Sequence, residues 1–279
     1  MKLCYAILLS IVSSFSISNA TQTISTHIYQ YDIFVKAEDV GDVTVKVVEQ
    51  ADGSYVLAES TLIDTVGFWG DINTRSTQIE TFSAEGHLLK ADVKTLNGKK
   101  AYWRTAELSD DELWTAYTQV QNVTEKEEGE FVSAALTLGN SMVTGLGNAL
   151  GVVQLLFSDS EAEPKNLRFA TSTYDTSFSN LPFYWESNQL NLPAQINLFD
   201  SEKLAVNTYN VEYLGKKSVQ NSSVEREVVA SHYKLQALDG QQIEVWLAIN
   251  DYNSPFFLQI VGADGDGPYH IKLKQHPGE

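Results

Sequence analysis

Few of the side chains that usually carry out chemistry are grouped in this sequence. Imidazoles bind metals or move protons, but none of the five histidines stands at helical metal-ligand spacing from another histidine. His232, in the middle of an expected strand and beside Tyr233, is the one whose neighbours suggest a site, although a hydrogen-bonded structural histidine has the same pattern. The histidines are His27, His87, His232, His270 and His276.

The acidic clusters also match no complete catalytic or metal-binding motif. Asp264-Gly-Asp266-Gly resembles the start of a calcium loop but lacks the third acid and the distal Glu, so it predicts a turn. Asp110-Asp111-Glu112 is typical of a solvated turn. There is no phosphate-binding glycine loop and no Gly-x-Ser-x-Gly elbow. We therefore expect no enzyme, no cofactor and no metal. A hydrolase built from distant carboxylates, or from His232 and an acid, is an alternative.

Alternation of apolar and polar residues predicts a meander of antiparallel strands over 27–121. Asp52-Gly53 and Asn97-Gly98 are hairpin signals, and Gly41 marks a turn between the first two strands. Ser109–Glu112 fits either a hairpin turn or a helix capping box. The Tyr, Thr and Val residues that follow favour the hairpin.

The next segment breaks this pattern, because Val132–Phe157 contains no charged residue and no histidine. Thr124-Glu-Lys-Glu127 is a capping box with acidic residues in the first turn, which predicts a helix start. Four glycines follow and argue against one straight helix, so we expect a broken apolar helix, or two short helices, over 124–157. It is interpreted as a core plug on the concave face of a sheet, as a hinged lid over a ligand, or as an element that contacts a membrane.

Strand patterns return over 167–275, with Asp239-Gly240 as a hairpin signal. A loop rich in aromatics interrupts them early, and Pro182 and Pro193 predict that this loop is irregular. The fold class is therefore mainly β: one large curved antiparallel sheet or half-open β-barrel, with the broken helix packed on its concave face. The aromatic residues of the loop are Phe178, Phe183, Tyr184 and Trp185.

The start of the chain predicts export. A positive start, an apolar run over 3–17 and small residues before a cut near Ala20 form a signal peptide, 1–20. The run is too short for a stable membrane anchor. The sole cysteine, Cys4, lies inside it, so residues 21–279, expected as one β-rich domain, have no disulfide. This favours the bacterial periplasm.

Charge limits the partners further. The chain has 36 acidic against 19 basic residues and a net charge of −17, with no basic run. Nucleic acids and anionic lipid surfaces are bound largely through Lys and Arg, so neither is an expected partner.

Aromatic residues are the best candidates for a binding surface. On a curved sheet, alternate residues line the concave face, where large rings either pack as core or line an apolar cavity. Taken with two apolar residues of the uncharged segment, they give the predicted lining: Trp69, Trp103, Trp114, Leu146, Leu150, Phe183 and Trp185.

Three phrases of the sequence resemble a group of uncharacterised Gram-negative periplasmic β proteins that form a domain of unknown function. Their architecture is similar to the half-open β-barrel of the lipoprotein carriers LolA and LolB. The resemblance covers most of residues 21–279 and implies a concave apolar cavity closed by helices, a place that 132–157 would take. It implies no site residue by residue. The phrases are Tyr31–Val35 with Gly41–Val47, Ser179–Trp185 with Ile196–Asp200, and Ile243–Asp251 with Pro255–Leu258.

The sequence thus predicts a periplasmic protein that binds or carries an apolar ligand such as a lipid or acyl chain. A non-enzymatic envelope interaction or assembly factor is the first alternative, favoured if Phe183-Tyr184-Trp185 are exposed on a well-filled barrel. The hydrolase is the second.

Overall fold

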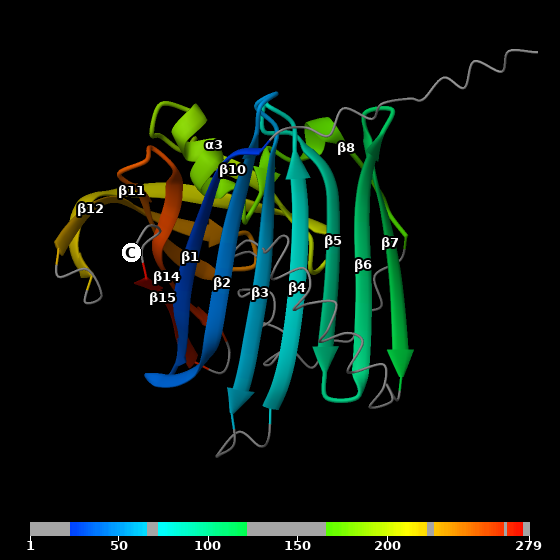
Figure 1. The fold of residues 1–279 in the computed structure, drawn as a ribbon, viewed down its shortest axis with the longest axis horizontal. Helices are drawn as coiled ribbons and strands as arrows, with labels where there is room; N and C mark the ends of the chain where they lie inside the picture. The colour runs from blue at the N-terminus through cyan, green and yellow to red at the C-terminus, as the bar shows by residue number, and fades with distance from the viewer. Residues whose placement is uncertain (1–22, 66–71, 122–165, 222–225, 265–266, 276–279) are drawn as a thin grey trace, which may run out of the picture.

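The computed structural model describes residues 23–65, 72–121, 166–221, 226–264 and 267–275, which form one curved 15-stranded sheet (Figure 1). The predicted helical segment 124–157 and the signal peptide lie outside these residues. The first half supplies seven consecutive antiparallel strands: β1 (Thr23–Val35), β2 (Glu38–Gln50), β3 (Tyr55–Thr65), β4 (Ile72–Phe82), β5 (Leu88–Asn97), β6 (Lys100–Ser109) and β7 (Glu112–Gln121).

The second half forms the rest of the sheet and one short helix. These elements are β8 (Arg168–Ala170), a 3-10 turn (Thr171–Thr173), β9 (Thr176–Ser177), α3 (Leu181–Ser187), β10 (Gln195–Asp200), β11 (Ala205–Asn221), β12 (Arg226–Ala237), β13 (Gln242–Ile249), β14 (Pro255–Asp264) and β15 (Gly267–Gln275).

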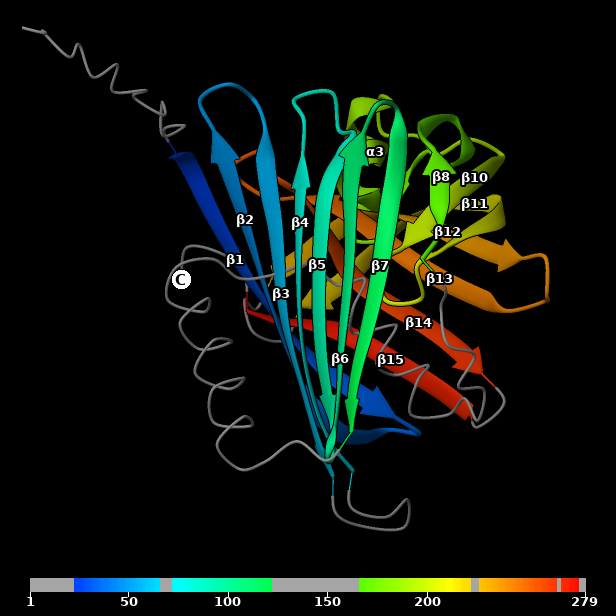
Figure 2. The ribbon, with the colours of Figure 1, turned by 90° about the vertical axis from the view of Figure 1, so that its right-hand side faces the viewer.

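The two meanders join through the pairing of β1 with β15, and every pair is antiparallel except β9 with β10. The sheet curls strongly but stays open, with β8 and β9 as its two edges (Figure 2). One short stretch, 168–177, supplies both edges. Phe169 and Tyr174 from this stretch each pack at 5.8 Å from the ring of Phe199. The predicted large curved antiparallel sheet is confirmed.

Hairpin turns lie where the sequence predicts them. Gly53, Gly98 and Gly240 have positive φ at the turns that precede β3, β6 and β13. Asp110 and Asp111 adopt φ of 53° and 63°, which suits a two-residue turn of the I′ kind between β6 and β7. The hairpin interpretation of Ser109–Glu112 is therefore confirmed.

The prediction of a turn at Gly41 is wrong. Lys36 and Ala37, with φ of 50° and 68°, make the turn, and Gly41 lies inside β2 beside a register shift in the β1–β2 pairing. A Cβ at Gly41 would lie 2.0 Å from the carbonyl oxygen of Leu62. This glycine is required because β3 approaches so closely, and not because the chain turns.

The irregular loop predicted at Pro182 is also wrong, because α3 forms there. Proline is accepted in the first turn of a helix, where its missing N–H has no partner to lose. Leu181 and Trp185 bury one face of α3 in the core, against β13 and β14. Trp185 Nε1 donates to the Tyr233 hydroxyl at 3.1 Å. Among the described residues, no helix has the length and apolar character needed to cross a membrane.

Candidate functional site

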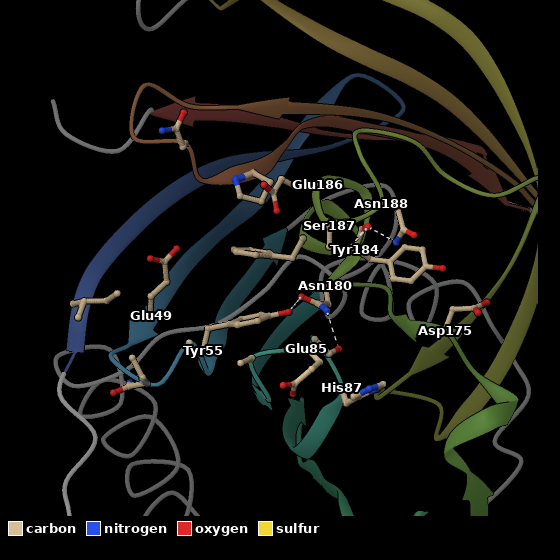
Figure 3. Close-up of a pocket in the computed structure, with 18 residues that line it drawn as sticks. Glu49, Tyr55, Glu85, His87, Asp175, Asn180, Tyr184, Glu186, Ser187 and Asn188 are labelled. Atoms are coloured by element: carbon tan, nitrogen blue, oxygen red, sulfur yellow. Dashed lines mark hydrogen bonds between the residues drawn. The ribbon is translucent and has the colours of Figure 1, made fainter.

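The candidate site is an open groove of about 480 Å³ at the end of the sheet where α3 lies (Figure 3). Three hairpin turns form its walls: those between β2 and β3, between β4 and β5, and between β13 and β14. The start of β1, the residues before β9, and α3 complete it. Because hairpins place turns at sheet ends, residues far apart in sequence meet here.

Stacked aromatic rings run from the sheet interior to the groove. The ring of Tyr55 stacks on Phe82 at 5.1 Å and on Phe183 of α3 at 4.8 Å between centroids. Phe82 is fully buried, whereas Phe183 is half-buried and lines the groove. Phe183 therefore presents the water-facing apolar side of this stack, and the buried rings of Tyr55 and Phe82 support it from behind.

Hydrogen bonds fix the orientation of Tyr55. Its hydroxyl donates to Asn180 Oδ1 at 2.9 Å, and Asn180 Nδ2 donates to Thr176 Oγ1 at 2.9 Å. Burial raises the pKa of the Tyr55 hydroxyl, so it stays neutral and acts as a donor. The aromatic surface is therefore held in place before any ligand arrives.

The rim of the groove is acidic. Glu49, Glu85, Asp175 and Glu186 line it, and no Lys or Arg does. Ser25 Oγ donates to Glu49 Oε2 at 2.6 Å, and the Asn197 N–H donates to Asp175 Oδ2 at 2.7 Å. The hydrogen bond from Ser83 lowers the pKa of the exposed Glu85 carboxyl, which favours its charged form.

A cluster of polar side chains lies buried next to the groove. The carboxyl of Glu80, on β4, accepts hydrogen bonds from Ser177, Ser179 and Ser201. Ser177 Oγ also accepts from the backbone N–H of Asn180, which links this serine–glutamate cluster to the groove wall. Burial raises the pKa of Glu80, even though the three serine donors act in the opposite direction.

An ion pair lies in the same interior. Arg104 Nη1, on β6, is 3.0 Å from Glu202 Oε1, and Thr95 Oγ1 donates to the same carboxyl at 3.0 Å. Arg104 also lies 5.2 and 5.6 Å from the ring centroids of Tyr102 and Tyr117. Burial raises the pKa of the Glu202 carboxyl, and the attraction of Arg104 acts in the opposite direction.

These two interior groups join the halves of the sheet. Glu80 and Arg104 come from the first meander, and their partners come from the segment between β9 and β11. Glu80 and Glu202 are 0% and 2% exposed, so solvent does not reach either carboxyl. Their geometry supports a structural role. No group of three or more His, Cys, Asp or Glu able to hold a metal occurs among the described residues.

Burial of the two carboxyls predicts a specific pH dependence. A raised folded-state pKa means that the folded protein holds its proton more tightly than the unfolded chain. The free energy of unfolding therefore falls as pH rises from about 4.5 towards the folded pKa. We expect Glu80→Gln to flatten this fall between pH 5 and 8, as measured by urea unfolding. Glu107→Gln, on the exposed side of β6, is the control; equal slopes in both variants would contradict the expectation.

The residues predicted to line a binding cavity do not lie together in the structure. Phe183 lines the groove, and Trp185 is 3% exposed and belongs to the core. Trp103 lies on the face of β6 opposite Arg104, and Trp114 is 45% exposed with the Arg168 guanidinium 3.5 Å over its ring. Neither lines the groove. Trp69, Leu146 and Leu150 lie outside the described residues.

His232 occupies a structural position. Its ring stacks on Trp246 at 4.0 Å, and its Nε2 lies 2.7 Å from Glu244 Oε2. It lies on the face of β12 opposite Tyr233, which packs inward against Trp185. The groove therefore does not include it.

Sequence reasoning missed Tyr55, Asn180 and the rim carboxylates because they are ordinary turn and strand residues that meet only at the sheet end. It also missed Glu80. Over 74–80 of β4 the inward residues Thr74, Ser76, Gln78 and Glu80 are all polar, and so are most of the outward ones; a buried apolar ring returns only at Phe82. A strand that is polar on both faces gives no apolar face to follow.

No family model matches the sequence, and no curated protein matches it. The structure is similar to the crystal structure of a β-barrel-like protein of the domain of unknown function DUF1849 from Brucella abortus. The TM-score is 0.54 at 13% sequence identity, over 91% of this chain and 98% of that one. This likeness shows a shared β-barrel-like fold. It agrees with the expected resemblance to β proteins of unknown function, while the similarity to LolA and LolB stays a prediction.

Proposed function

We propose that the protein is a periplasmic binding protein that holds an apolar ligand, such as a lipid or acyl chain, without reacting with it. The observation that supports this is the half-buried ring of Phe183, stacked on the buried Tyr55, inside a groove of about 480 Å³. Small-molecule sites typically occupy about 300–1,000 Å³ and combine apolar rings with a few polar groups.

The alternatives receive less support from the same residues. An assembly factor was expected to present Phe183, Tyr184 and Trp185 together, but Trp185 is buried against Tyr233. A hydrolase built on His232 or on the buried carboxyls receives no support, because His232 lies outside the groove and Glu80 and Glu202 are sealed from solvent. The acids that a substrate could touch are the four on the groove rim.

A first test is native mass spectrometry of the protein purified from its own periplasm, followed by organic extraction. A lipid or other apolar molecule retained near one-to-one would support the proposal and identify the ligand class. A protein that emerges empty and also binds no fluorescent apolar probe would refute it.

The site itself is tested by Phe183→Ala. Loss of one aromatic contact worth about 0.5–1.5 kcal/mol, together with the apolar area of the ring, is expected to weaken binding of a neutral fluorescent probe by about tenfold. Trp114→Ala removes an aromatic side chain outside the groove and should leave the affinity unchanged. Circular dichroism of both variants checks the fold. Equal affinities of Phe183→Ala and wild type would place the ligand elsewhere.

A further inference from the structure

The groove carries acidic side chains in addition to its apolar ones. Four of its eighteen lining residues are Asp or Glu, and none is Lys or Arg. These acids come from four separate elements, so no local run of sequence explains their meeting. Figure 3 shows Glu49, Glu85, Asp175 and Glu186 arranged around the contact between Tyr55 and Asn180.

The rim carboxylates keep free capacity for a ligand. A carboxylate can accept about four hydrogen bonds. The described contacts give Glu49 one serine donor and Asp175 one backbone donor. Within the described part of the chain, none of the four forms an ion pair with Lys or Arg.

Aromatic rings and carboxylates together recognise one chemical class. The face of an aromatic ring attracts a cation, and nearby carboxylates add Coulomb attraction and accept its N–H groups. A carboxylate or phosphate head group would instead be repelled by all four acids. The uniform sign of the rim therefore selects among apolar ligands by the charge of their polar end.

We infer that the groove binds an amphipathic amine: a ligand whose apolar part packs on Phe183, which Tyr55 backs, while its ammonium group lies at the rim that carries Glu49, Glu85, Asp175 and Glu186. This rests on the proposed function and narrows it. An acyl chain fits when its polar end is an amine.

Three probes with one dansyl fluorophore and one undecyl chain test this inference: 11-(dansylamino)undecanoic acid, its methyl ester, and the corresponding undecylamine. We expect the amine to bind about tenfold more tightly than the ester, and the acid more weakly than the ester. The preference should shrink between about 0.02 M and 0.5 M salt, because salt screens exposed charges.

The double variant Glu49→Gln, Glu186→Gln removes two of the four rim acids. It should reduce the preference for the amine over the ester from about tenfold to about threefold and leave ester affinity unchanged. Glu107→Gln, which removes an exposed acid outside the groove, should preserve the preference for the amine. If the ester binds as tightly as the amine, or the double variant keeps the full preference, this inference is overturned while the proposed function stands. If no probe binds, both are overturned.

Discussion

Replacing Arg104 by methionine is expected to lower the free energy of unfolding by about 3–5 kcal/mol, because Glu202 is left buried without its partner. Glu202 is 2% exposed, and Arg104 Nη1 is the cation beside it at 3.0 Å. The loss should be smaller at pH 5 than at pH 8. Without the guanidinium, a carboxyl whose pKa is already raised escapes the penalty by binding a proton. Urea unfolding at both pH values measures this.

The matched control replaces both partners, Arg104→Met with Glu202→Leu. Removing a buried pair together, with side chains of similar volume, is commonly close to neutral. We therefore expect the double variant to recover most of the stability. A single variant as stable as wild type would show that the pair is not buried as described. A double variant as unstable as the single one would assign the loss to packing around Tyr102 and Tyr117.

The second large effect is expected at Gly41. Gly41→Ala adds a Cβ that would lie 2.0 Å from the Leu62 carbonyl oxygen and 3.0 Å from the Ile63 Cα, both in the backbone of β3. Backbone atoms of a paired strand cannot rotate away as a flexible side chain can, so β2 and β3 must separate locally. We expect a loss of about 3 kcal/mol or more, at the upper end of overpacking penalties, in thermal or urea unfolding.

Gly98→Asn is the control for this substitution. Gly98 has a φ of 55° in the turn between β5 and β6, and a Cβ there meets nothing within 4 Å. Asparagine tolerates this conformation, so its cost should be a few tenths of a kcal/mol. A Gly41→Ala protein as stable as Gly98→Asn would mean that the β2–β3 contact relaxes easily.

The two variants also separate stability from binding. Gly41 and Arg104 do not line the groove, whereas Phe183 and the rim acids do. Substitutions at Gly41 and Arg104 should therefore lower the temperature of unfolding. Substitutions at Phe183 and at the rim acids should instead change ligand affinity. This separation is expected because the groove uses exposed or half-buried side chains on turns and on α3, and the interior uses buried side chains on strands.

The sequence alone determined the features that depend on neighbours along the chain. Hairpin turns follow from residues that accept positive φ, as at Gly53, Gly98 and the Asp110–Asp111 pair, and the strands follow from period-two patterning. Repeated short hairpins then favour one antiparallel meander, so the fold class could be predicted. At Gly41 the same reasoning failed, because a turn and a close approach of another strand both select glycine.

Only the tertiary structure decided what lies inside the sheet and at its end. Glu80 meets its serines across 97, 99 and 121 residues of sequence, and Asn180 meets Tyr55 across 125. No periodicity encodes such meetings. They depend on how far the sheet curls, and that curl is set by the summed twist of 15 strands and by the packing of α3 and the β9–β11 segment against it. Short-range patterns therefore specify the strands, while long-range closure brings the groove and its buried support together.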